Sequence, residues 1–194
     1  MITNELSQEM GRRGRSQFGK EGHTFFVTTT VVEFARIFSC GTVYYDILVG
    51  SLRHVLHEHR APLLAYVLMP SHVHLIPAMP AGESISDLMR DFKKYTSTTI
   101  REQLQRERRE AFLETLHRNG KLKKHQEFKL WMDRFDDNVI RDDKTLATKI
   151  EYIHNNPVKA GFVSTPEDWI YSSAADYLGI RRGPLTVTTD WSRL

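Results

Sequence analysis

Two apolar runs separated by only two residues constrain the fold of this chain more than any other feature of its sequence. The runs Leu63–Met69 and His72–Met79 have the length and composition of strands, and Pro70-Ser71 between them is a turn signal. Strands joined so tightly must pair with each other in an antiparallel arrangement. The sequence therefore predicts a β-hairpin within an antiparallel sheet.

Strand and helix patterns alternate around this hairpin. Upstream, Thr24–Val32 is rich in β-branched and aromatic residues, which favours a strand, and Val43–Arg60 has apolar residues at helical spacing. Downstream, Ser84 or Ser86 can cap a helix whose apolar face continues, as one helix or as a pair, to about His117. Helices with one apolar face are expected to pack on the sheet.

The last third of the chain adds further elements. Asn119-Gly120 is a helix-ending signal, and Lys129–Ile140 can supply a fourth strand. Thr145–Asn155 has the pattern of a short helix that Pro157 stops, with Gly161 completing the exit. The resulting order β-α-β-β-α-β, followed by a helix, predicts an α+β fold, the ferredoxin-like sandwich, with helices packed on an antiparallel sheet.

Composition sets the class of protein. With 40% hydrophobic and 26% charged residues, the 194-residue chain is expected to form one domain at 23–163, between a flexible basic arm at 1–22 and a packed tail at 164–194. The single cysteine, Cys40, excludes an internal disulfide and a zinc site built from cysteines. The chain has neither an apolar run long enough to span a bilayer nor, in its first twenty residues, the apolar core of a signal peptide. The cytoplasm is therefore the expected compartment.

The formal net charge of +3 is unevenly distributed. Between Arg90 and Lys129, twelve Lys and Arg residues stand against six Asp and Glu residues, so the rest of the chain is acidic. Such a basic segment is typical of proteins that contact phosphate backbones. It is also compatible with a solvated helix face that carries ion pairs between neighbouring turns. Charge alone leaves nucleic-acid binding open.

Two histidines at the start of the second hairpin strand are the sharpest local feature. Residues i and i+2 of a strand project to the same face, so His72 and His74 present two imidazoles side by side, with Val73 on the opposite face. Two neutral imidazoles on a rigid face suit a divalent metal, which still needs a third ligand. The alternative is a polar sheet face without a metal.

A second feature lies near the end of the last helix. Tyr152 and Asn156 are four residues apart, so a helix stacks them on one face, while His154 faces elsewhere. A phenol can act as a nucleophile, and an amide oxygen can bind a metal. The structural alternative is a core tyrosine, with Asn156 capping a helix that ends before Pro157.

Together the two motifs resemble those of a known family. PSHVHLI at 70–76 and YIHNNPVKAGFV at 152–163, in that order, resemble the single-tyrosine HUH transposases, and most closely the REP-associated tyrosine transposases of bacteria. GHTFFVTTTV at 22–31 and FDDNVIRDD at 135–143 add to this resemblance, which spans roughly residues 20–180.

The resemblance implies a site and an activity. His72 and His74 match the metal-binding HUH pair on a central strand, and Asn156 matches the residue that completes a site for Mg²⁺ or Mn²⁺. Tyr152 matches the catalytic tyrosine. The implied substrate is single-stranded DNA, often beside an imperfect palindromic hairpin, which the enzyme cuts and rejoins through a 5′-phosphotyrosine intermediate. Such an enzyme is expected at the bacterial nucleoid when bound to DNA, as a monomer or a homodimer.

Two positions depart from the family pattern. Ser71 precedes the first histidine where an asparagine is common, which is expected to alter a turn. The polar stretch Asp136–Asn138 lies where relatives often place a histidine or an aromatic residue. The surroundings of the metal site are therefore expected to differ from those of relatives.

DNA is expected to be held by basic residues and aromatic rings. The predicted phosphate contacts share a basic side chain and lie in the basic helical stretch or the N-terminal arm: Lys93, Lys94, Arg101, Arg12, Arg13 and Arg15. Unpaired bases can stack on exposed aromatic rings, for which Phe25, Trp131 and Tyr171 are candidates.

Two other functions fit the same residues. A domesticated DNA-binding protein would keep the fold and bind hairpins without cutting them, although it has no chemical need for both histidines and the tyrosine. A metal-dependent phosphodiesterase would cut DNA by hydrolysis, with Tyr152 in a structural role. A covalent adduct between protein and DNA separates the transesterase from both.

Overall fold

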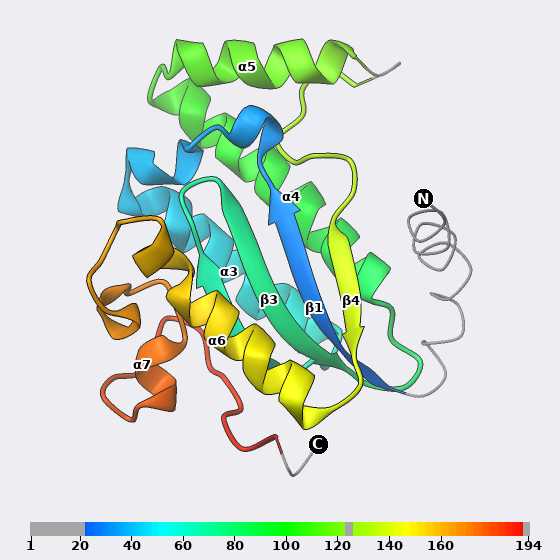
Figure 1. Ribbon diagram of the computed structural model, residues 1–194. Coiled ribbons are helices and arrows are strands. Elements are labelled where there is room, and N and C mark those ends of the chain that lie inside the picture. Colours follow the sequence, from blue (N-terminus) through cyan, green and yellow to red (C-terminus); the bar gives the residue numbers. More distant parts are fainter. Residues whose placement is uncertain (1–21, 123–125, 192–194) are drawn as a thin grey trace, which may run out of the picture.

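The computed structural model describes residues 22–122 and 126–191, and its centre is a four-stranded antiparallel sheet (Figure 1). The strands, in the spatial order β2-β3-β1-β4, are β1 (His23–Thr30), β2 (Leu63–Leu68), β3 (His72–Met79) and β4 (Asp136–Ile140). The predicted hairpin is confirmed, since the Met69 amide donates to the His72 carbonyl oxygen at 2.8 Å across the Pro70-Ser71 turn. β1 lies between β3 and β4, which is the predicted ferredoxin-like arrangement.

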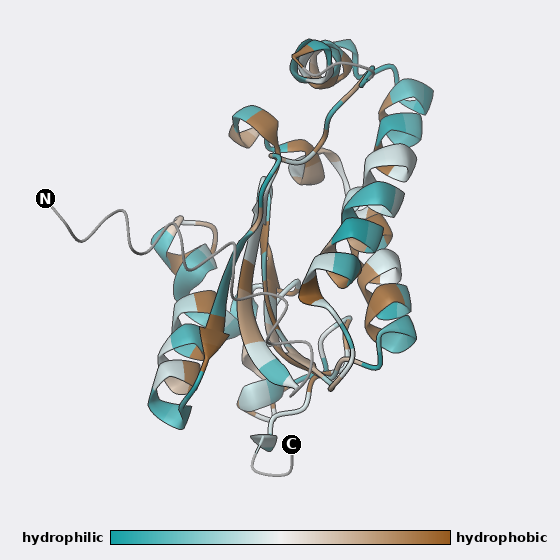
Figure 2. Cartoon of the chain, turned by 90° about the vertical axis from the view of Figure 1, so that its right-hand side faces the viewer, coloured by the Kyte–Doolittle hydropathy of each residue, from teal (hydrophilic) through white to brown (hydrophobic). Residues whose placement is uncertain are grey.

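Helices cover both faces of this sheet, as the edge-on view of Figure 2 shows. α3 (Thr42–Glu58) and α4 (Ile85–Arg106) pack on one face, and α6 (Asp143–Lys159) packs on the other. Alternation along β1 explains the division, because Phe25 packs toward α3 and α4 whereas Phe26, the next residue, packs toward α6. The sheet is therefore the middle of three layers.

The basic helical stretch forms a pair of helices, one of the two arrangements that the sequence left open. Ser84 caps α4 by accepting a hydrogen bond from the Asp87 amide at 3.4 Å, and α5 (Glu110–Lys121) follows. α5 ends at Lys121, one residue beyond the predicted Asn119-Gly120 signal, and its C-cap is Leu122, so the glycine is not the cap. The glycine instead permits close packing, since a Cβ there would lie 2.5 Å from the backbone of Phe128.

The fourth strand is shorter than the predicted range Lys129–Ile140. β4 begins only at Asp136, and the residues before it run along the end of β1 into the core. Trp131 is 4% exposed, and its Nε1–H donates to Thr96 Oγ1 of α4 at 2.9 Å. The aromatic residues of this range therefore serve the core beside α4 and are not part of the strand.

The C-terminal segment packs along the outer edge of β2. The Leu68 amide donates to the Tyr171 carbonyl oxygen at 2.9 Å, and the Ser173 amide donates to the Tyr66 carbonyl oxygen at 3.1 Å. The short helix α7 (Ala174–Tyr177) follows. Three 3₁₀ turns complete the described structure: η1 (Val32–Phe34), η2 (Ile37–Cys40) and η3 (Pro166–Asp168). The C-terminal segment therefore covers the outer edge of β2, which would otherwise be open to pairing with another strand.

Two predictions concern the ends and the environment of the chain. Residues 1–21 lie outside the described residues, and with them the predicted contacts Arg12, Arg13 and Arg15. Among the helices that the structure describes, none combines the length and the apolar character needed to cross a membrane.

Candidate active site

β3 presents His72 and His74 on the face that α6 covers. Their ring centroids are 4.9 Å apart, while Val73 between them packs into the core on the other face. On the neighbouring strand β1, Thr30 pairs with His72 and Thr28 pairs with His74. The central position of β3 thus gives both imidazoles a rigid base.

Asn156 reaches both histidines from α6. Its Oδ1 lies 3.3 Å from His72 Nε2, and its Nδ2 lies 3.3 Å from His74 Nε2. The side-chain amide therefore bridges the two rings. Three polar groups that are far apart in the sequence meet between α6 and the sheet.

α6 holds Asn156 in this place because the helix continues past it. The prediction that the helix stops at Pro157 is wrong: the proline is buried inside the last turn, and the Ala160 amide still donates to the Asn156 carbonyl oxygen at 3.0 Å. The Phe162 amide then donates to the Pro157 carbonyl oxygen at 2.9 Å, and Gly161 has a φ of 72°. This is a Schellman cap, so the predicted exit at Gly161 is confirmed.

Tyr152 lies one helical turn before Asn156. Its ring meets the rings of His74 and Phe26 edge-on, at centroid separations of 5.4 and 5.8 Å. The side chain is nevertheless 42% exposed, which argues against a core tyrosine. The ring is positioned by the sheet while the side chain remains accessible from solvent.

Burial keeps both site histidines neutral. Burial lowers the pKa of His72, and the Asn156 contact opposes this effect without cancelling it. Burial also lowers the pKa of His74 to about 3, with smaller contributions from the nearby His72 and from the charge on Lys149. Neutral imidazole is the form that binds metals, so neither ring has to lose a proton at pH 7.

The donor atoms fit a divalent metal ion. His74 Nδ1 lies 2.8 Å from the Thr28 hydroxyl and His72 Nδ1 lies 3.3 Å from the Ser71 hydroxyl, so both Nε2 atoms are left to face Asn156. Two imidazole nitrogens and an amide oxygen suit Mn²⁺ or Mg²⁺, with further positions open to water or phosphate. Among the described residues, no three His, Cys, Asp or Glu side chains come together, so a metal held by the two histidines would need the amide as its third protein ligand.

Two lysines of α6 add positive charge beside the tyrosine, and sequence reasoning missed both. Lys159 Nζ lies 5.6 Å from the Tyr152 ring centroid, and Lys149 Nζ lies 4.6 Å from that of Phe26. Their signal was present, because they lie seven residues after and three residues before the tyrosine, on the same helix face. Both ammonium groups can attract an anion toward the phenol.

The predicted phosphate contacts on α4 lie on the opposite side of the sheet from Tyr152 (Figure 2). Lys93 Nζ donates to a backbone carbonyl oxygen at 2.8 Å, and the Arg101 guanidinium stacks on the Phe128 ring at 4.3 Å. Lys94 is exposed on the same helix. The structure does not bring these three side chains to the histidines, and they stay predictions of DNA contacts away from this site.

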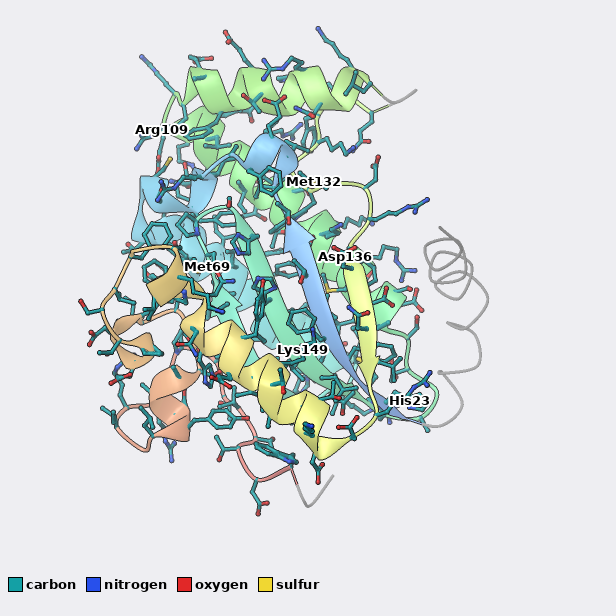
Figure 3. All side chains as sticks on the ribbon, in the orientation of Figure 1. His23, Met69, Arg109, Met132, Asp136 and Lys149 are labelled. Atoms are coloured by element: carbon teal, nitrogen blue, oxygen red, sulfur yellow. The ribbon has the colours of Figure 1, made fainter. Side chains whose placement is uncertain are left out.

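Two further residues from the sequence motifs lie near the site without joining the three donors. Asp136 pairs with Thr28, which puts it on the α6 face at the start of β4 (Figure 3). His154 Nε2 lies 2.9 Å from Ser173 Oγ, so it ties α6 to the C-terminal segment. This contact agrees with the expectation that His154 and Tyr152 face different ways.

Comparisons with known proteins agree on one family. The family model described as "Transposase IS200 like" matches residues 44–156. A Haemophilus influenzae protein named as a REP-associated tyrosine transposase is 32% identical over 159 residues, which cover 82% of this chain and 83% of that protein. The REP-associated tyrosine transposase of Escherichia coli is 27% identical over 154 residues, covering 79% of this chain and 77% of the other.

A solved structure supports the fold. A REP-associated tyrosine transposase bound to a REP hairpin superimposes with a TM-score of 0.62 at 22% identity, covering 87% of this chain and 88% of the other. The matched family segment contains the paired histidines, the tyrosine and the asparagine that the fold brings together. The sequence matches, the geometry of the site and the fold therefore all indicate a transposase. A transposase is an enzyme that processes DNA. We conclude that the chain belongs to the IS200-like transposase family, in the branch of the REP-associated tyrosine transposases.

Proposed function

We propose that this protein is a metal-dependent transesterase that cuts and rejoins single-stranded DNA through a 5′-phosphotyrosine intermediate, at hairpin-forming repetitive palindromic elements. The observation that carries the proposal is the meeting of the His72 and His74 Nε2 atoms at the Asn156 amide, one helical turn from Tyr152. Membership of the transposase family supports DNA as the substrate. The similar structure bound to a REP hairpin supports hairpin DNA in particular.

Tyr152 is the proposed nucleophile. Its hydroxyl oxygen attacks the phosphorus of a phosphodiester, the bond from phosphorus to the 3′-oxygen breaks, and the phenol loses a proton while the 3′-oxygen gains one. The products are a free 3′-hydroxyl end and a 5′-phosphotyrosine, so a phosphodiester is exchanged and none is hydrolysed. Attack by the 3′-hydroxyl of another strand on the phosphotyrosine reverses the step and rejoins DNA.

The charges around Tyr152 favour this substrate. Lys149 and Lys159 carry positive charge close to the site rings, so the anionic backbone is drawn to the face on which the phenol lies. The partial exposure of Tyr152 leaves its hydroxyl open to the strand that it attacks and later to the strand that replaces it.

The metal site would be formed by His72, His74 and Asn156. The Thr28 and Ser71 hydroxyls hold the two rings from their Nδ1 sides, so the Nε2 atoms stay on the Asn156 side. A Mg²⁺ or Mn²⁺ ion held by these three residues would supply Lewis-acid stabilisation of the negative charge on the phosphate.

Covalent trapping on a denaturing gel tests the proposal. Hairpin DNA with single-stranded flanks and a 3′-end label is incubated with Mn²⁺ and the wild-type protein, Tyr152→Phe or Tyr95→Phe. Tyr95 lies on α4 with a 55% exposed side chain and is a matched control for an accessible tyrosine. We expect a labelled adduct with the wild type and with Tyr95→Phe, and none with Tyr152→Phe or with a chelator.

The position of the label gives a second check. DNA labelled at its 5′ end must be released as a shorter fragment with a 3′-hydroxyl that a polymerase extends. Metal-dependent cleavage without an adduct would contradict the proposal in favour of hydrolysis with Tyr152 in a structural role. Tight binding of hairpins without cleavage in either metal would favour a domesticated DNA-binding protein.

A further inference from the structure

Phe34 is the most exposed aromatic residue among those that the structure describes, with a relative exposure of 66%. The rings suggested by the sequence as stacking surfaces differ from it. Phe25 and Trp131 are each 4% exposed, and the Tyr171 ring lies flat against that of Tyr45 with centroids 3.8 Å apart. A single exposed apolar side chain is ordinary on a protein surface, so exposure alone assigns no role to this ring.

The backbone at this position is unusual as well. Glu33 and Phe34 have φ angles of 55° and 54°, in the left-handed region that residues other than glycine and asparagine seldom adopt. Two such residues follow each other, and the second carries the exposed ring. Strained backbone of this kind persists where the surrounding structure holds it, and it is concentrated at functional sites.

Neighbouring elements hold this turn in place. The Glu33 carboxylate accepts hydrogen bonds from the Arg118 guanidinium at 2.8 and 3.2 Å and from Asn119 Nδ2 at 2.7 Å, both on α5. The Val32 amide donates to the Leu130 carbonyl oxygen at 2.9 Å. These contacts hold the turn that carries the Phe34 ring. The negative charge of Glu33 is paired with Arg118.

The turn lies at the end of the sheet where the histidine motif begins. η1 follows the arrowhead of β1 in Figure 1, and Met132, labelled in Figure 3, donates its amide hydrogen to the Thr30 carbonyl oxygen there. Thr30 pairs with His72, and at most ~15 Å of chain separates Phe34 from Thr30. Arg36, two residues further along the chain, is exposed, and its guanidinium lies over the Phe162 ring at 4.9 Å.

We propose that Phe34 is a stacking platform for an unpaired base of the DNA strand, a few nucleotides from the phosphate that Tyr152 attacks. This inference rests on the proposed function. An exposed ring beside cations is the arrangement that binds single strands, because the ring stacks on a base while the cations contact the backbone. Since the turn is already held before DNA arrives, little conformational entropy is lost when a base stacks.

Binding of single-stranded DNA tests this inference without any chemistry. All proteins carry Tyr152→Phe, and the metal is chelated. The probes are a mixed-sequence strand of about 16 nucleotides and a hairpin with the same strand as its flank, each with 2-aminopurine at successive unpaired positions. We expect Phe34→Leu to bind both probes roughly five- to one-hundred-fold more weakly and to lose the fluorescence quenching at one position. Phe34→Trp should bind at least as tightly as phenylalanine.

Three controls separate stacking from folding. Leucine keeps most of the apolar volume, so a loss of binding with leucine is due to the aromatic ring. Phe34→Gly relieves the backbone strain, so this variant should fold at least as stably as the wild type and still bind weakly. Tyr95→Leu removes an exposed ring on α4, outside the Phe34 turn, and should leave binding unchanged.

Three outcomes would overturn the inference. They are unchanged binding and quenching in Phe34→Leu, no binding of either probe by a protein with Phe34 intact, and a changed oligomeric state in Phe34→Leu with unchanged DNA affinity. The last would assign the ring to a contact between copies of the chain. A failure of the proposed function is distinguishable, because it would appear as a missing adduct in the covalent assay whatever the effect of Phe34 on binding.

Discussion

The two faces of the sheet are built from the same four strands and both bury apolar side chains, but the α6 face also carries the polar residues of the site. On the face covered by α3 and α4, Val27 of β1 and Phe92 of α4 are fully buried in a mostly apolar core. On the face covered by α6, the same strands contribute Thr28 and His74, and the helix leaves Tyr152 42% exposed. Packing closes the α3/α4 face to solvent, whereas the α6 face is only partly closed to solvent.

This difference separates stability from chemistry within one small domain. The face covered by α3 and α4 buries the larger apolar cluster and therefore contributes most of the hydrophobic stabilisation. The α6 face instead holds neutral buried histidines, which are costly in acid, beside a tyrosine that adds little to the core. Variants on the two faces should therefore fail in different ways, and the expected effects below run from the largest to the smallest.

The largest effect on stability is expected on the α3/α4 face. Phe92→Ala removes a fully buried ring that packs 5.6 Å from the Trp131 ring, so we expect a loss of about 3–5 kcal/mol in the free energy of unfolding. Tyr152→Ala, on the other face, should cost less than about 1 kcal/mol because its side chain is partly exposed. Urea denaturation measures both. Equal losses would contradict the separation of the two faces.

Acid should lower the free energy of unfolding through the buried histidines on the α6 side of the sheet. The pKa values of His74 and His154 are lowered by burial to about 3 and about 4, whereas unfolded histidine titrates near 6.5. Below about pH 6.5 the unfolded chain therefore takes up protons that the folded chain cannot, and stability falls as the pH falls. Between pH 7 and pH 5 each histidine should remove on the order of 2 kcal/mol. His154→Gln should remove its own share of this drop, on the order of 2 kcal/mol, in metal-free urea titrations, and an unchanged drop would contradict the assignment.

Metal addition should stabilise the α6 face. Mn²⁺ at about one hundred times its dissociation constant should add ~2.7 kcal/mol to the unfolding free energy of the wild type and raise Tm by several degrees. Asn156→Ala and His72→Ala should lose most of this stabilisation, because each removes a proposed ligand. Phe34→Leu, which leaves all three ligands in place, is the control. A shift of the same size in Asn156→Ala would rule out the proposed ligand set.

The smallest effects concern the lysines on the two sides of the sheet. Lys159→Ala should slow strand cleavage about five- to ten-fold, because it removes a positive charge beside Tyr152. Lys94→Ala should lower DNA affinity about two- to five-fold without changing the cleavage rate at saturating DNA, since α4 lies on the other side of the sheet. A slower cleavage step in Lys94→Ala would contradict this prediction, because it would show that α4 affects the reaction at Tyr152.

Local patterns predicted β1, β2, β3 and most of the helices, whereas the proposed roles of the four site residues came from the resemblance to a family. The i, i+2 spacing of His72 and His74 and the i, i+4 spacing of Tyr152 and Asn156 are properties of regular strands and helices, and both sets face the same site in the structure. These two spacings agreed with the fold.

Signals that depend on distant parts of the chain were misleading or missing. Gly120 looked like the cap of the helix, but Leu122 is the cap, and the glycine lies in the last turn of α5 where the backbone of Phe128 packs closely against it. Pro157 is a local signal that also failed, because the last turn of α6 and its cap at Gly161 accommodate a proline. The contact of Thr28 with His74 follows from cross-strand register, which no local pattern contains. The basic charge of α4 likewise could not tell which side of the sheet that helix covers.

The most direct measurement maps the attachment site of DNA on the protein. The adduct formed with Mn²⁺ is digested with a nuclease and trypsin, and the peptide that keeps a nucleotide is sequenced by mass spectrometry. Cleavage after Lys149 and Lys159 releases the peptide 150–159, which contains one tyrosine and no serine, threonine or cysteine. The account predicts a nucleotide joined through its 5′-phosphate to Tyr152 in this peptide. A nucleotide on any other residue, or cleaved DNA with no modified peptide, would contradict it.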